Sequence, residues 1–149
     1  MNKILLALVI LINSHSFYAQ DYKMNVESFF NQIFNEKNLV TKEFYKEHIF
    51  SECKRISKKK LKILHANIDH LKSINSTLLN KNTTTFSVQK YEDCKLNDLA
   101  VFNKSIMNNV LVISENKKVV TYVLIQDSKI KSFNTITKSG ETFFFGEFN

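Results

Sequence analysis

The sequence predicts an α+β fold, with three N-terminal helices packed on one face of a curved antiparallel sheet of about five strands. Two observations support this prediction. Apolar residues recur at helical spacing as far as Leu78, whereas from Phe86 onward they alternate or form β-branched runs. Polar stretches of hairpin length separate those runs, which favours an antiparallel order of the strands. Helices that precede a sheet in this way are typical of α+β proteins.

Each of the three helices is predicted from a stripe of apolar side chains or from an N-cap residue. Thr41 and Ser57 are of the type that caps helix N-termini, and they would start the second and third helices. The first helix is expected over residues 24–37, and its apolar face comprises Val26, Phe29, Phe30, Ile33 and Phe34. The second stripe comprises Tyr45, Ile49, Cys53 and Ile56, with His48 at its edge, and the third comprises Leu61, Leu64, Ile68, Leu71 and Leu78.

Strands are expected through the second half of the chain. Alternation at Phe86 and Val88, and again at Leu99 and Val101, indicates short strands. A polar turn over residues 114–118 joins two β-branched runs, and Asp127-Ser128 and Ser139-Gly140 mark the later reversals. The runs themselves cover residues 110–113, 119–125, 130–136 and 142–148.

Residues 1–19 have the layout of a secretory signal peptide. A short basic start that contains Lys3 is followed by an apolar run over residues 4–12 and a polar segment that ends at Ala19. Cleavage after Ala19 is favoured, and cleavage after Ser16 is the alternative. The apolar run is about half of the ~20 residues that a spanning helix needs, so we expect no transmembrane segment in the mature form. Residues 20–149 would then form a single exported domain, periplasmic or secreted.

The composition excludes several kinds of chemistry. Two glycines and no proline among 149 residues leave no phosphate-binding loop, dinucleotide fingerprint or nucleophile elbow. The chain also lacks the His-Glu-x-x-His and Cys-x-x-Cys patterns, so we expect no metal and no cofactor. A net charge of +7 attracts anionic partners, but the basic run over residues 54–62 contains no interleaved aromatic residues. A nucleic-acid partner is therefore not favoured, and this run is interpreted as a solvated corner.

Cys53 and Cys94 are the only cysteines in the chain. In an exported protein an even number of cysteines indicates a disulfide. A bond between these two would close a loop of about 40 residues and contribute on the order of 4 kcal/mol. Two separate buried thiols are the alternative, since Cys53 falls on an apolar helical face.

His65 and Asp69 are the candidate catalytic residues. Side chains four residues apart on a helix can touch, and an acid–histidine pair can act as a general base. The alternative is a surface pair that flanks the apolar stripe. His48 is interpreted as a boundary histidine that water or the backbone satisfies.

Aromatic residues of the sheet are the candidate ligand- or partner-binding residues: Phe143, Phe145, Tyr122 and Tyr91. Consecutive strand residues face opposite sides, so the run that ends at Phe145 can be buried only if both faces of its strand are covered. An aromatic face used for binding, or a central strand between two layers, would each satisfy this requirement.

The helix sequence Val-Glu-Ser-Phe-Phe-Asn-Gln-Ile-Phe at residues 26–34, and the order of three helices before a sheet, resemble the NTF2-like and cystatin-like small exported domains. The resemblance implies a cone-shaped pocket and carries over no functional residue. These observations favour an exported binding module for a small apolar ligand or an envelope protein, which includes an immunity or inhibitor role. A hydrolase or isomerase that uses His65 and Asp69 is the alternative, and electrostatic attachment to the anionic envelope is a third hypothesis.

Overall fold

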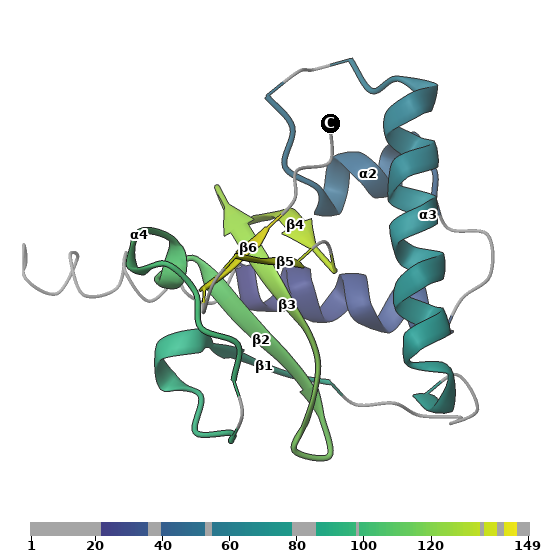
Figure 1. Ribbon diagram of the computed structural model, residues 1–149. Coiled ribbons are helices and arrows are strands. Elements are labelled where there is room, and N and C mark those ends of the chain that lie inside the picture. Colours follow the sequence, from purple (N-terminus) through teal and green to yellow (C-terminus); the bar gives the residue numbers. More distant parts are fainter. Residues whose placement is uncertain are drawn as a thin grey trace, which may run out of the picture.

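The computed structural model describes residues 22–35, 40–52, 55–78, 86–97, 99–134, 136–139 and 142–145, and the predicted signal peptide lies outside them. The first described helix covers residues 22–35 and is purple in Figure 1. It is followed by α2 (Lys42–His48), α3 (Lys58–Ile74), η1 (Ser76–Leu78), β1 (Ser87–Lys90), η2 (Tyr91–Asp93), α4 (Lys104–Met107), β2 (Val110–Glu115), β3 (Lys118–Gln126), β4 (Lys129–Phe133), β5 (Ile136–Ser139) and β6 (Thr142–Phe145). The α+β class is therefore confirmed. Within these residues, every helix is too short or too polar to cross a membrane.

The strands form two sheets, where the sequence predicted one. Strands β1, β2, β3 and β4 pair in that order in an antiparallel sheet, and β5 and β6 pair as a separate hairpin. The predicted strand over residues 130–136 is interrupted, because β4 ends at Phe133 and Asn134 takes the left-handed conformation with a φ of 61°.

Two tight turns connect the long strands of the four-stranded sheet. Glu115 pairs with Lys118, so only Asn116 and Lys117 form the turn, in place of the five residues expected. Gln126 pairs with Lys129 across Asp127 and Ser128 in the same way. All four turn residues have φ between 49° and 63°, as in a type I′ hairpin turn. Asn116 and Asp127 tolerate this conformation, whereas a residue such as Lys117 normally avoids it.

We expect Lys117→Gly to raise the free energy of unfolding by about 1 kcal/mol, because the left-handed conformation penalises a side chain with a Cβ. Urea denaturation monitored by circular dichroism measures the change. Lys118→Gly is the matched control: it lies in β3 and should lower stability by about 0.5–1 kcal/mol. A loss of stability in both variants would contradict the assigned turn.

The first described helix, α2 and α3 cover one face of the four-stranded sheet (Figure 1). Side chains of the first described helix, α2 and α3 pack there against alternate residues of the strands. The sheet contributes Val88, Leu111, Ile113, Val123, Ile130 and Phe133 to this core. A second cluster on the other face centres on Phe102, Val110, Val112 and Tyr122, and it is covered by the segment after β1 and by β6. The sheet therefore lies between two layers.

The starts of α2 and α3 follow the prediction, and the end of α2 does not. The hydroxyl of Thr41 accepts a hydrogen bond from the Phe44 amide, and that of Ser57 accepts one from the Lys60 amide. The second helix was expected to continue toward Ile56, but α2 ends at His48. The next residues pair with β4 instead, where the Phe50 amide donates to the Ile130 carbonyl over 2.8 Å.

The alternation of Leu99 and Val101 wrongly predicted a strand. The described part of this segment is irregular apart from a single bridge between Phe102 and Phe143. It continues into the short helix α4, which Asn103 caps through its side-chain oxygen. Phe102 enters the second cluster here, so tertiary packing overrides the local pattern.

Candidate functional site

The four aromatic residues proposed for binding lie together in the structure, around a ring that the sequence did not single out. Phe102 contacts Tyr91, Tyr122, Phe143 and Phe145, with ring centroids 5.6, 5.1, 6.3 and 5.0 Å away. Phe102 is only 2% exposed and occupies the centre of the group. Phe143 and Phe145 thus pack in the layer between the four-stranded sheet and the hairpin, and β6 is a strand of that two-stranded hairpin rather than a central strand.

Tyr122 contributes a polar contact to this second cluster. Its hydroxyl accepts a hydrogen bond from the Ala100 amide over 2.9 Å. Burial raises the pKa of Tyr122, so the phenol stays protonated. The ring thus fixes the irregular segment before Phe102 against β3.

The predicted contact between His65 and Asp69 is confirmed, with Nδ1 and Oδ2 2.7 Å apart. Both side chains are about 60% exposed on α3. This geometry corresponds to the surface-pair alternative.

Cys94 is half-buried in the second cluster and forms no disulfide among the described residues. Cys53 lies outside the described residues. The disulfide between the two therefore remains a prediction.

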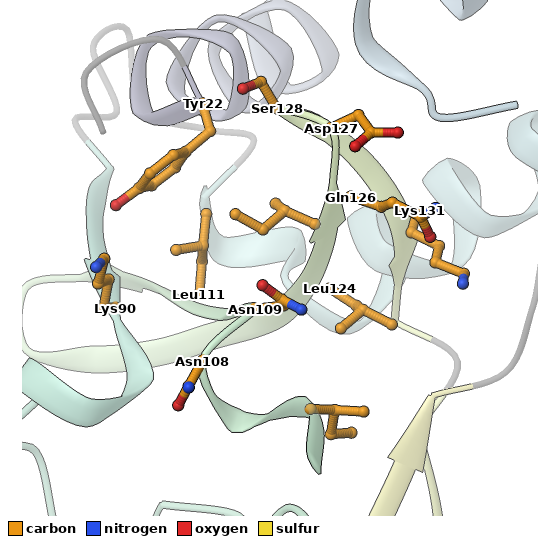
Figure 2. Close-up of a pocket in the computed structure, with 12 residues that line it drawn as sticks. Tyr22, Lys90, Asn108, Asn109, Leu111, Leu124, Gln126, Asp127, Ser128 and Lys131 are labelled. Atoms are coloured by element: carbon orange, nitrogen blue, oxygen red, sulfur yellow. The ribbon is translucent and has the colours of Figure 1, made fainter. Parts of the chain in front are cut away.

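A pocket of about 530 Å³ lies at one end of the four-stranded sheet (Figure 2). Strands β1 and β3 end there, while β2 and β4 begin there. We call it the sheet-end pocket. It is lined by Tyr22, Lys90, Ile106, Asn108, Asn109, Leu111, Leu124, Ile125, Gln126, Asp127, Ser128 and Lys131.

Polar groups surround a small apolar floor in the sheet-end pocket. Figure 2 shows Tyr22 and Lys90 on one side and Gln126 and Lys131 on the other, with Asn109 between them. The Asn109 carbonyl accepts a hydrogen bond from the Ile125 amide over 2.9 Å, which fixes the backbone that carries its side chain.

The two lysines differ in their partners. Lys90 lies 3.6 Å from the Glu92 carboxylate, whereas Lys131 has no ion pair within the described part of the chain. The pocket can therefore offer an ammonium group and three side-chain amides to a ligand, beside the single carboxylate of Asp127.

A second pocket of about 380 Å³ shares Asp127 and Ser128 with the sheet-end pocket. The buried side chain of His48 lines it. The Asn25 amide nitrogen donates to the Ser128 carbonyl over 2.8 Å, so the Asn25 oxygen faces His48 Nδ1, 2.6 Å away. This orientation assigns the ring proton to Nδ1. Nε2 then accepts from the Gln32 amide nitrogen over 3.3 Å.

His48 is therefore a neutral core histidine rather than the boundary residue expected. It is 1% exposed and contacts the rings of Phe29 and Phe44. Burial lowers the pKa of His48, and the nearby Lys129 adds to this effect. Glu47, with Oε1 3.7 Å from Nε2, and the hydrogen bond to Asn25 oppose it. One signal of this network is present in the sequence, because Asn25, Ser28 and Gln32 follow one polar stripe of the first helix.

The fold and the sheet-end pocket define a small α+β protein whose sheet is covered on both faces and which has an amphipathic cavity. No protein-family model, curated protein or solved structure matches this chain.

Proposed function

We propose that this protein is an exported binding module that holds a small, polar, negatively charged ligand in the sheet-end pocket. The observation that carries the proposal is the arrangement of Lys90, Lys131 and the amides of Asn109 and Gln126 around one cavity. A volume of about 530 Å³ suits a ligand of metabolite size. A net charge of +7 favours the approach of an anion.

The lining modifies the ligand class inferred from the sequence. An apolar ligand was expected, but eight of the twelve lining residues are polar and the apolar floor is limited to Ile106, Leu111, Leu124 and Ile125. A ligand with one carboxylate and several hydroxyl groups matches these walls. Its charge would meet Lys131, and its hydroxyl groups would meet the amides.

Binding without catalysis is supported by the state of the nearby histidine. Asn25 and Gln32 engage both ring nitrogens of His48, so the ring has no free nitrogen with which to take a proton from a substrate. The exposed pair of His65 and Asp69 does not line the cavity. Export is supported by the signal-peptide pattern of residues 1–19. Three helices before an antiparallel sheet support the NTF2-like and cystatin-like resemblance as part of the same proposal.

Lys131→Gln tests the pocket. Glucuronate serves as the probe, and glucose serves as its neutral analogue. We expect glucuronate to bind about tenfold more tightly than glucose, and Lys131→Gln to remove most of this difference, since a hydrogen bond to a charged group contributes about 1.5–3 kcal/mol. Isothermal titration calorimetry at low salt measures both affinities.

Lys62→Gln is the matched control for the change of charge. Lys62 is exposed on α3 and does not line the sheet-end pocket, so its variant should bind glucuronate like the wild type. Equal losses in both variants would show a general charge effect and contradict the proposal. Equal affinities of the wild type for glucuronate and glucose would also contradict it.

A further inference from the structure

The β3–β4 turn forms part of the lining of two pockets. Asp127 and Ser128 form this turn and line both the sheet-end pocket and the smaller pocket beside His48. Both residues have positive φ, and Ser128, at 60°, is of a type that rarely adopts this conformation. Contacts from outside the turn therefore contribute to holding it in place.

Asn25 supplies one of these contacts and connects the turn to His48. Its amide nitrogen donates to the Ser128 carbonyl over 2.8 Å, and its oxygen accepts from His48 Nδ1 over 2.6 Å. Asn25 lies on the first described helix, His48 at the end of α2 and Ser128 between β3 and β4. The side-chain amide of Asn25 therefore connects three elements, and its hydrogen bond to the His48 ring fixes its orientation.

The neutral ring of His48 suits its buried surroundings better than a charged ring would, since the side chain is 1% exposed. Gln32 presents its amide nitrogen to Nε2, and the same nitrogen donates to the Ser28 hydroxyl over 3.0 Å. A proton on Nε2 would place two donors face to face. Gln32 can relieve this by turning its oxygen toward Nε2, because the Ser28 hydroxyl can donate to that oxygen as well. The charged ring would still be buried among apolar rings, and its movement toward water would take it away from Asn25.

We propose that Asn25 and His48 are positioning residues for the sheet-end pocket, and that protonation of His48 loosens the β3–β4 turn and weakens ligand binding. This inference rests on the proposed function. Both pockets meet at the turn, so a change in the smaller pocket alters the wall of the larger one.

Charged groups near the His48 ring would also transmit an effect of its protonation to the turn. Glu47 from α2 lies 3.7 Å from Nε2 and attracts a charged ring. Lys129, directly after the turn, repels it, and Asp127 lines the same pocket. The first described helix presents the neutral side chains of Asn25 and Gln32 to the ring. The repulsion acts on the segment that forms the pocket wall.

The direction of the pH effect follows from the pKa. Burial holds the pKa of folded His48 below its ordinary value of 6.5. Above pH 6.5 the ring is neutral in both the folded and the unfolded chain, and its contribution to stability is complete. As pH falls below 6.5 the unfolded chain takes up the proton first, so stability declines. Turn order and ligand affinity should fall as pH passes through the lower, folded pKa.

The first test uses the ligand-free protein. Amide NMR signals of Ser128 and Lys129, and the side-chain amide of Asn25, are followed from about pH 8 to about pH 5. We expect them to shift with the same midpoint as the His48 ring. His65→Ala removes an exposed histidine and should leave these titrations unchanged. His48→Gln should abolish them.

Asn25→Asp is the second variant, in case His48→Gln does not fold. Its carboxylate would stabilise the charged ring and move the midpoint to higher pH. It would also lack the donor to the Ser128 carbonyl. The inference would be overturned if the His48 ring of the wild type titrates while the amide signals of Ser128 and Lys129 do not shift.

The second test measures glucuronate affinity at about pH 7.5 and about pH 5.5, where the carboxyl group of the probe stays ionised. We expect affinity to fall by about tenfold in the wild type and to stay constant in His48→Gln. Affinity that is independent of pH would overturn the inference and leave the pocket intact. Absence of binding at either pH, together with titrating turn amides, would overturn the proposed function and show that His48 still controls the turn.

Discussion

Replacing Phe102 by alanine is expected to lower the free energy of unfolding by about 3–5 kcal/mol and to release the β5–β6 hairpin. Phe102 is 2% exposed and contacts four aromatic rings. Two of these rings, Phe143 and Phe145, belong to β6. The substitution would therefore remove the main packing between the hairpin and the four-stranded sheet.

The hairpin depends on this contact because a two-stranded sheet is marginally stable in water. Apart from this ring packing, one backbone hydrogen bond among the described residues joins the hairpin to the second cluster. The Phe143 amide donates to the Val101 carbonyl over 2.7 Å. Without the Phe102 ring, β5 and β6 should open at a lower free energy than the rest of the protein.

Hydrogen exchange measures the two effects separately. In Phe102→Ala the Phe143 amide should lose its protection, while amides of β2 and β3 stay protected at a reduced level. Val101→Ala is the matched control: the side chain is 54% exposed, so the expected change is within about 0.5 kcal/mol. Retained protection at Phe143 would show that the hairpin does not rest on Phe102.

Phe29→Ala should also lower the free energy of unfolding by about 3–5 kcal/mol, because it removes a ring from the core between the helices and the four-stranded sheet. Phe29 is fully buried and contacts Phe44 of α2, His48 and Phe133 of β4 at centroid distances of 5.5, 5.7 and 5.2 Å. One ring thus joins the first helix to α2 and the sheet. Since whole domains are stable by about 5–15 kcal/mol, this loss threatens the global fold.

Chemical denaturation of Phe29→Ala should give a lower midpoint whether unfolding is followed at the helices or at the sheet. Both contribute side chains to the core that contains Phe29. Met24→Ala provides the comparison on the same helix. Its side chain is 58% exposed, and the expected change is within about 0.5 kcal/mol. A loss below about 1 kcal/mol in Phe29→Ala would contradict the assignment of this ring to the centre of the core.

Local sequence signals predicted much of the fold because they act over a few residues. Thr41 and Ser57 cap helices as expected, since an N-cap needs only a side-chain oxygen and the following amides. The reversal at Asp127-Ser128 was found for a similar reason. The end of α2 was missed because Ile49 pairs with Ile130, which lies far along the chain.

The candidate site was harder to predict, since its residues meet only in the folded protein. Tyr91, Tyr122, Phe143 and Phe145 were selected together, and they do contact one ring, but Phe102 is out of phase with the alternation of Leu99 and Val101 that precedes it. The sheet-end pocket combines strand ends and turns, and its asparagines are not conspicuous in a sequence rich in asparagine. The role of His48 depends on Asn25 and Gln32, which belong to another helix.

Mapping glucuronate on the protein by amide NMR at about pH 7.5 is the decisive test of the proposed binding module, because it locates the ligand. We expect shifts that saturate and that glucose does not reproduce. They should cluster at Lys90, Asn108, Asn109, Gln126 and Lys131. Shifts confined to the exposed basic residues around the start of α3, and lost as salt is added, would contradict a pocket ligand and favour electrostatic attachment instead.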